Sequence, residues 1–63
     1  MPIVTVNMLE GRTDEQKAAL IKEVTDAICH SIDAPIASVR VIINEMTNTQ
    51  FGIGGKTAKE LGR

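Results

Sequence analysis

Two short segments rich in β-branched residues flank one longer amphipathic segment, and this arrangement leaves few folds open. Ile3–Leu9 reads IVTVNML and residues 39–43 read VRVII, and both compositions are typical of strands. Between them, apolar residues recur at helical spacing over Asp14–Ile32. Two strands joined through a helix by short connections form a right-handed unit whose strands are parallel. The sequence therefore predicts one β-α-β unit, of the α/β (α+β) class.

The two ends of the predicted helix carry their own signals. Thr13 and Gln16 have the spacing of a capping box, in which each side chain accepts a hydrogen bond from the backbone N–H of the other residue. Pro35 ends the helix, because the residue before a proline avoids the helical conformation. We expect the core-facing side of the helix, flanked by Ile21, to consist of Leu20, Val24, Ala27, Ile28 and Ser31.

Residues 46–63 contain most of the glycines and predict a turn-rich tail with a short hairpin near Phe51. Residues 55–57 read GKT, like the end of a phosphate-binding loop. That loop requires a glycine at position 50, where Gln50 stands, and a long helix afterwards. The sequence therefore favours glycines that shape a turn. No repeat or linker is visible, so we expect residues 1–63 to form a single domain.

Both faces of the predicted sheet are apolar. Val4 and Val6 lie on one side of the first strand, whereas Ile3 lies on the other, and the second strand likewise has Val41 on one side and Ile42 on the other. A single helix covers only one face, although such sheets are usually covered on both. A chain of 63 residues without a disulfide also buries too little apolar surface alone. The uncovered face of the sheet and the short chain both predict an oligomer.

Composition and charge argue against several classes of protein. The net charge is −1 and the basic residues are dispersed, unlike the basic clusters of nucleic-acid-binding proteins. No apolar run approaches the ~20 residues that span a bilayer, and no signal peptide is visible. Cys29 and His30 point in different directions on the helix, so we expect them to be packed or exposed and not to bind a metal. We expect a cytoplasmic protein without cofactor, nucleic-acid or membrane partner.

Pro2 is the residue with the most distinctive acid–base potential. A small second residue permits removal of Met1, which would leave a secondary amine at the start of the first strand. The competing interpretation is a proline that simply begins an edge strand. Because parallel strands start at the same end of a sheet, we expect Pro2 to lie near Arg40. Arg12 lies in the turn before the helix, and turns often carry binding residues.

Such a group of residues is chemically coherent. Burial and a neighbouring guanidinium both disfavour the protonated amine and lower its pKa. Arginine binds carboxylates through two parallel hydrogen bonds, so the site would select anions. Two other interpretations stay open here: Arg12 as a solvated turn residue and Arg40 as part of an intersubunit salt bridge.

Five segments occur in an order that covers essentially the whole chain: residues 2–3, 9–17, 33–35, 38–43 and 51–55. On these segments the chain resembles the 4-oxalocrotonate tautomerase family; each is weak alone, but the ordered set is specific. The resemblance implies a β-α-β fold that dimerises into a four-stranded sheet, with three dimers forming a homohexamer. It also implies cofactor-free isomerisation of 2-hydroxymuconate to 2-oxo-3-hexenedioate, in the bacterial breakdown of catechol-type aromatics.

The resemblance also implies a role for each site residue. Pro2 resembles the general base that takes the 2-hydroxyl proton and returns a proton at C5. Arg40 resembles the residue that binds the carboxylate and 2-oxygen at one end of the diacid, and Arg12 the residue that binds the far carboxylate. Phe51 resembles the apolar wall that keeps the amine dry, and Leu9 the residue whose backbone amide lies near the substrate oxygen. In the family these residues come from different subunits.

Two further functions remain as alternatives. A proline-dependent hydratase or dehalogenase of small unsaturated acids would need a carboxylate or an extra arginine to activate water beside Pro2, and no obvious candidate is present. A non-catalytic oligomeric scaffold would follow if Met1 were retained, because the Pro2 nitrogen would then be an amide.

Overall fold

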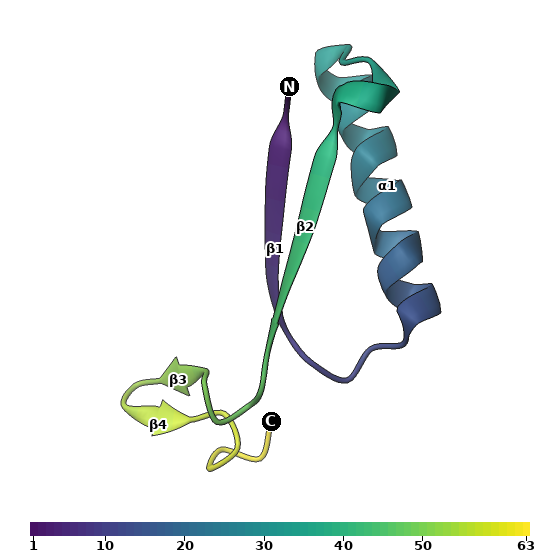
Figure 1. Cartoon of the computed structure of the whole chain (residues 1–63). Helices are drawn as coiled ribbons and strands as arrows, with labels where there is room; N and C mark the ends of the chain where they lie inside the picture. Colours follow the sequence, from purple (N-terminus) through teal and green to yellow (C-terminus); the bar gives the residue numbers. More distant parts are fainter.

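The computed structural model describes all 63 residues. Its elements, in chain order, are β1 (Ile3–Leu9), α1 (Asp14–Ile32), the 3-10 helix η1 (Ile36–Ser38), β2 (Arg40–Met46), β3 (Gly52–Ile53) and β4 (Lys56–Thr57). β1 and β2 pair in parallel, and β3 and β4 form a separate antiparallel hairpin (Figure 1). The prediction of a β-α-β unit followed by a short C-terminal hairpin is confirmed.

The helix α1 begins and ends where the sequence predicts. The Thr13 N–H donates to Gln16 Oε1 at 3.0 Å, and the Gln16 N–H donates to Thr13 Oγ1 at 3.1 Å, so the capping box is formed. At the other end Asp33 adopts a left-handed conformation with φ 55°, which aspartate tolerates better than most residues. The structure contains no helix whose length and apolar character would let it cross a membrane.

The prediction of the core-facing side of α1 is only partly correct. Leu20, Val24 and Ile28 are half-buried, but Ala27 and Ser31 are exposed. The reason is that α1 runs beside β2 and leaves the rest of its circumference uncovered (Figure 1). Only a narrow strip of the helix is therefore protected by this chain alone.

The second strand is longer than predicted. We expected residues 39–43, whereas β2 begins one residue later and ends three residues later, at Met46. Its polar end continues the parallel register with β1, because Asn44 lies opposite Asn7 and donates to its side-chain oxygen at 3.3 Å. The short helix η1 before β2 was not predicted at all. It closes through the Ser38 N–H, which donates to the Pro35 carbonyl at 3.0 Å.

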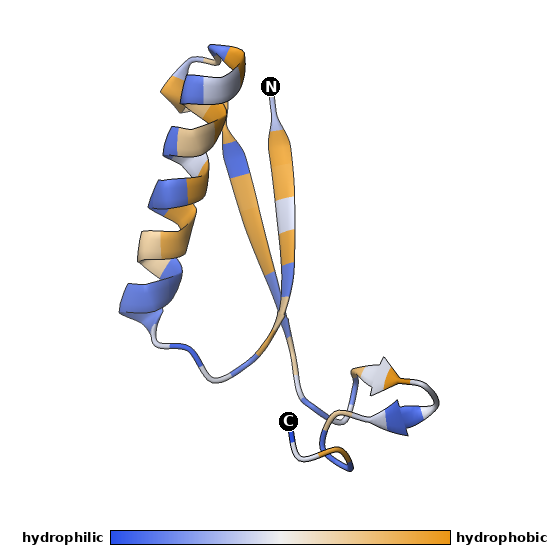
Figure 2. Ribbon diagram, turned by 180° about the vertical axis from the view of Figure 1, so that it is seen from behind, coloured by the Kyte–Doolittle hydropathy of each residue, from blue (hydrophilic) through white to orange (hydrophobic).

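The sheet is covered on one face only. Val4 and Val41 are half-buried on the face toward α1, whereas Ile3 and Ile42 are 62% and 47% exposed on the other face. Figure 2 shows the apolar character of both strands. Ala58 is the only buried residue in the chain. A single copy therefore has no hydrophobic core of its own.

Residues 47–63 form an arm that leaves the sheet after β2 (Figure 1). The radius of gyration is 14.7 Å, against about 11 Å for a compact chain of this length. Within the arm, the Ala58 N–H donates to the Phe51 carbonyl at 2.8 Å, and the Arg63 N–H donates to the Ala58 carbonyl at 2.8 Å. Gly54 and Gly55 have φ of 60° and 87°, as a tight hairpin turn requires. The arm is held together by these backbone bonds and by side-chain bonds such as that from Asn48 Nδ2 to the Arg63 carbonyl, and its strands β3 and β4 do not pack onto β1 or β2.

Candidate active site

The N-terminus lies at the start of the parallel sheet, as predicted. The Arg40 N–H donates to the Pro2 carbonyl at 2.9 Å, and Ile3 pairs with Arg40 in the strand register. Pro2 is half-buried, whereas Met1 is 79% exposed. The backbones of Pro2 and Arg40 are therefore direct neighbours, although the two residues lie 38 positions apart in the sequence.

The Arg40 guanidinium is held at this end of the sheet by backbone carbonyls. Its Nη1 donates to the carbonyl oxygens of Ala37, at 2.8 Å, and Val39, at 3.3 Å. No carboxylate lies within ion-pair distance of it in the chain. The residue is exposed, so its outer N–H groups remain able to bind an anion. The carbonyl of Ala37 belongs to η1, so this short helix helps to hold the Arg40 side chain at the exposed end of the sheet.

Leu9 lies at the opposite end of β1. The Pro2 carbonyl and the Glu10 N–H both bond to β2, the latter at 2.9 Å to Met46. Because backbone polar groups alternate along a strand, the N–H of Leu9 points to the edge of β1 that is remote from β2. That N–H is therefore not used in the hydrogen bonding between β1 and β2.

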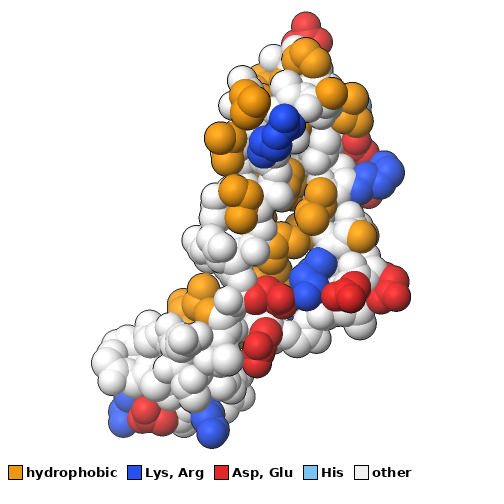
Figure 3. Space-filling view, in the orientation of Figure 1, with side chains coloured by type: hydrophobic (Ala, Val, Ile, Leu, Met, Phe, Trp, Pro, Cys, Tyr) orange, Lys and Arg blue, Asp and Glu red, His pale blue; other side chains and the backbone are white.

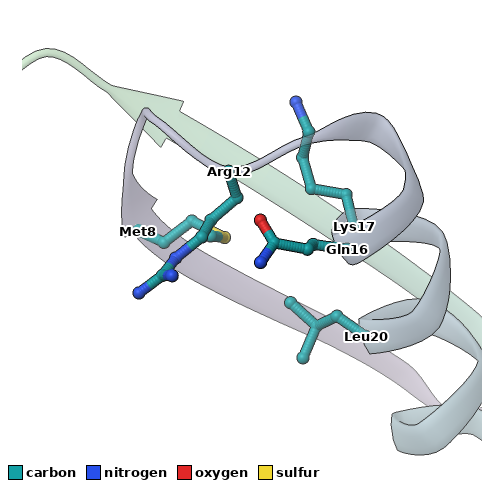
Figure 4. A pocket seen from close by; sticks show the side chains of 5 residues that line it. All are labelled: Met8, Arg12, Gln16, Lys17 and Leu20. Carbon is teal, nitrogen blue, oxygen red and sulfur yellow. The ribbon is translucent and has the colours of Figure 1, made fainter.

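Arg12 stands above a small pocket of about 260 Å³, together with Met8, Gln16, Lys17 and Leu20 (Figure 4). The pocket lies between the end of β1 and the first turns of α1. The side chain of Arg12 is exposed and makes no hydrogen bond or ion pair within the chain. It is therefore an unpaired cation in a pocket lined by apolar, amide and lysine side chains, and an unpaired guanidinium suits a carboxylate ligand.

One chain does not bring all the predicted site residues together. Pro2 precedes β1 and Arg40 begins β2, so both lie at one end of the sheet. Leu9 ends β1 and Arg12 follows it, roughly 23 Å away for a seven-residue strand. Phe51 lies on the arm and is 42% exposed. Figure 3 shows apolar side chains open to solvent over the strand and helix part of the molecule. The single chain thus presents separated parts of a site on surfaces that another copy could cover.

One polar contact beside Arg12 was not predicted from the sequence. Lys17 Nζ lies 2.9 Å from Glu45 Oε1 and joins α1 to β2. A signal for it was present: Lys17 precedes Leu20 on the apolar stripe of the helix, and Glu45 follows Val41 at the inward-facing spacing of β2. Two opposite charges at inward-facing positions of neighbouring elements are expected to pair.

Comparison with known proteins identifies the family. A sequence model of the tautomerase enzymes matches residues 2–60. The 2-hydroxymuconate tautomerase of Stutzerimonas stutzeri is 60% identical, and one from Pseudomonas putida is 57% identical, each over the full length of both chains. The chain belongs to the tautomerase family. It is accordingly an enzyme of the isomerase class, and the resemblance seen in the sequence is confirmed.

Solved structures agree with this assignment. A 4-oxalocrotonate tautomerase isozyme from Methylibium petroleiphilum is 45% identical, with a TM-score of 0.93 over 98% of this chain and 100% of that chain. A heterohexamer 4-oxalocrotonate tautomerase from Chloroflexus aurantiacus is 41% identical, with a TM-score of 0.91 over 97% of this chain and 98% of that chain. The extended arm and the uncovered sheet are thus features of a chain with the fold of these tautomerases.

Proposed function

We propose that this chain is a cofactor-free tautomerase that converts 2-hydroxymuconate to 2-oxo-3-hexenedioate, with the Pro2 nitrogen as base after removal of Met1. The full-length identity of 60% to a 2-hydroxymuconate tautomerase carries the proposal. The free imino nitrogen takes the 2-hydroxyl proton while the electrons of that bond form the 2-oxo group. The double bonds shift, and the protonated nitrogen returns a proton to C5. The reaction is a redistribution of protons and needs no oxidant.

The geometry at the start of the sheet supports the proposed base. Pro2 is half-buried and its carbonyl is bonded to Arg40, whose guanidinium is anchored by backbone carbonyls. A cation fixed near an amine disfavours its protonated form. In this proposal Arg40 also binds the carboxylate and 2-oxygen at the near end of the substrate, where negative charge accumulates during the reaction.

The far end of the diacid requires residues from other copies of the chain. We propose that Arg12 binds the far carboxylate, that Phe51 shields the amine from water and that the backbone amide of Leu9 lies near the substrate oxygen. Only an oligomer brings these residues to Pro2, because one chain separates them along β1. We propose dimers with a four-stranded sheet that assemble into a homohexamer; the Chloroflexus relative, a heterohexamer, supports this size. We also propose a place in the catabolism of aromatic compounds, which the names of the relatives support, and a cytoplasmic location.

Intact mass and a pH–rate profile, measured on the same active preparation, test the proposed base. We expect a mass without the initiator methionine and a rate that rises with pH as one group near neutrality loses its proton. Full activity in material that retains Met1 would disprove the proposal, because the Pro2 nitrogen would then be an amide. Retention of Met1 together with an absence of activity would instead favour the alternative of a non-catalytic scaffold.

A substrate comparison separates tautomerisation from the related chemistry of hydration or dehalogenation. Ultraviolet assays with 2-hydroxymuconate and with 3-haloacrylates report the two reactions independently. We expect rapid turnover of the first and none above background of the second. The opposite result would assign the chain to the hydratase or dehalogenase alternative, although no carboxylate lies within ion-pair distance of Arg40 to help activate water.

A further inference from the structure

The turn that carries Arg12 is tied to the rest of the chain on both sides. Before it, the Glu10 N–H donates to the Met46 carbonyl of β2 at 2.9 Å. After it, Thr13 and Gln16 close the capping box. The Arg12 side chain makes no bond of its own within the chain. The point from which the Arg12 side chain extends is therefore set by the backbone of this turn and by the packing of α1 against β2.

One ion pair joins the first turns of α1 to β2. Lys17 Nζ donates to Glu45 Oε1 at 2.9 Å, and the two side chains are 24% and 31% exposed. A second lysine–carboxylate pair, Lys22–Asp26, has the same bond length within 0.1 Å but lies on one helix, and its side chains are 73% and 37% exposed. The Lys17 pair is therefore better protected from water, and it alone of the two connects separate elements.

The pair lies beside the Arg12 pocket without occupying it. Glu45 is opposite Met8 in the strand register, and Met8 and Lys17 both line the pocket. The amino group of Lys17 points away from the guanidinium of Arg12 (Figure 4). Asp14 lies 3.6 Å from Lys17 but is 99% exposed, so it adds little. The ammonium group of Lys17 is thus already paired with a carboxylate, whereas the guanidinium of Arg12 is unpaired.

We propose that Lys17, through its ion pair with Glu45, is a positioning residue for Arg12 that fixes where the guanidinium meets the far carboxylate of a diacid. This inference rests on the proposed function, in which Arg12 binds that carboxylate. The hydrogen bond to Glu45 raises the pKa of Lys17, so the ammonium keeps its charge and the pair persists throughout the neutral range. Small displacements of binding groups reduce rates strongly. Loss of the ion pair would therefore reduce turnover if it shifted Arg12.

Steady-state kinetics on two substrates test the proposal. The assembled enzyme is assayed with 2-hydroxymuconate and with a monocarboxylate dienol that lacks the far carboxylate. We expect Lys17→Met to raise KM for the diacid about tenfold and to leave both constants for the monoacid within about twofold. Lys17→Arg keeps a donor that reaches Glu45, so it should restore KM for the diacid.

The chain offers a matched control and a second variant. Lys22→Met removes an equally short pair on the exposed face of the same helix, and we expect no change with either substrate. Glu45→Gln removes the other half of the pair with little change in size and should reproduce the effect of Lys17→Met. The double variant should be no worse than either single variant, because both remove one interaction.

Arg12→Ala distinguishes failure of this inference from failure of the proposed function. If Arg12→Ala impairs the diacid selectively while Lys17→Met and Glu45→Gln impair both substrates equally, the positioning role is disproved and Arg12 keeps its own. If Arg12→Ala itself fails to discriminate between the substrates, the proposed role of Arg12 is wrong and this inference fails with it.

Discussion

Arg40 shows how a charged residue can begin a strand with an apolar sequence. Two backbone carbonyls, those of Ala37 and Val39, accept hydrogen bonds from its Nη1. These bonds restrict the guanidinium before any ligand arrives, so less conformational entropy is lost when an anion binds. The same arginine donates its backbone N–H to the Pro2 carbonyl. Arg40 thus holds the backbone of the proposed base, Pro2, and places a guanidinium at the same end of the sheet.

Pro2→Ala should keep the fold and the assembly but lose most of the activity. Alanine supplies a primary amine without the restricted geometry of the ring, and the loss of a general base usually costs about 10²–10⁴-fold in rate. Initial rates with 2-hydroxymuconate measure the effect, and size-exclusion chromatography verifies the assembly. Rates equal to those of the unaltered enzyme would contradict the assignment of Pro2.

The Lys17–Glu45 ion pair should stabilise the folded enzyme at neutral pH and lose this effect at strongly alkaline pH. The pKa of Lys17 is raised by its hydrogen bond to Glu45 and further by the charges of Glu45 and Asp14. The pair therefore contributes fully below the ordinary lysine pKa of about 10.4 and loses its contribution as pH rises through the higher folded-state value. The gap in melting temperature between the unaltered enzyme and Lys17→Met should be constant from pH 7 to 9 and narrow as the pH rises above the ordinary lysine pKa. A gap that does not narrow under strongly alkaline conditions would contradict the ion pair.

Among the elements, the helix was the most predictable because its signals are local. The capping box and Pro35 fix its two ends within a few residues of sequence. β2 was predicted too short because Asn44 and Glu45 are polar, and their partners, Asn7 and Lys17, lie far away in the sequence. No sequence signal marked η1, which spans only three residues.

Thr13→Ala should weaken the start of α1. The variant removes the acceptor for the Gln16 N–H, and loss of an N-cap side chain typically costs about 1 kcal/mol. Chemical denaturation of the unaltered protein and the variant, at equal chain concentration, measures the change. Thr13→Ser is the matched control and should be nearly neutral. Equal losses from the two variants would exclude the hydroxyl as the stabilising group.

For the whole molecule, the dominant feature is that a single chain buries only Ala58. The sequence predicted this dependence on other copies from chain length and from the two apolar faces of the sheet. The neighbourhood of Pro2 and Arg40 could also be predicted, since parallel strands start together. The relation of Arg12 and Phe51 to Pro2 could not, because it depends on contacts between chains and on the direction of the arm.

Ile42→Glu tests the role of the uncovered sheet face. Ile42 is 47% exposed in the single chain and lies beside Thr5 on that face. A carboxylate there would be desolvated by any covering copy, at a cost that an apolar interface does not offset. We expect smaller species in sedimentation velocity and a large loss of activity. Glu23→Gln is the control, because Glu23 is exposed on the helix. This variant should assemble normally.

The placement of Pro2 and Arg12 at opposite ends of β1 has a consequence for mixtures of defective chains. Under the proposed assembly each reaction centre takes its imino group from one chain and its distal guanidinium from another. Chains carrying Pro2→Ala and chains carrying Arg12→Ala are each defective alone. After co-refolding, some centres receive both intact groups, so the mixture should regain activity that neither variant has alone.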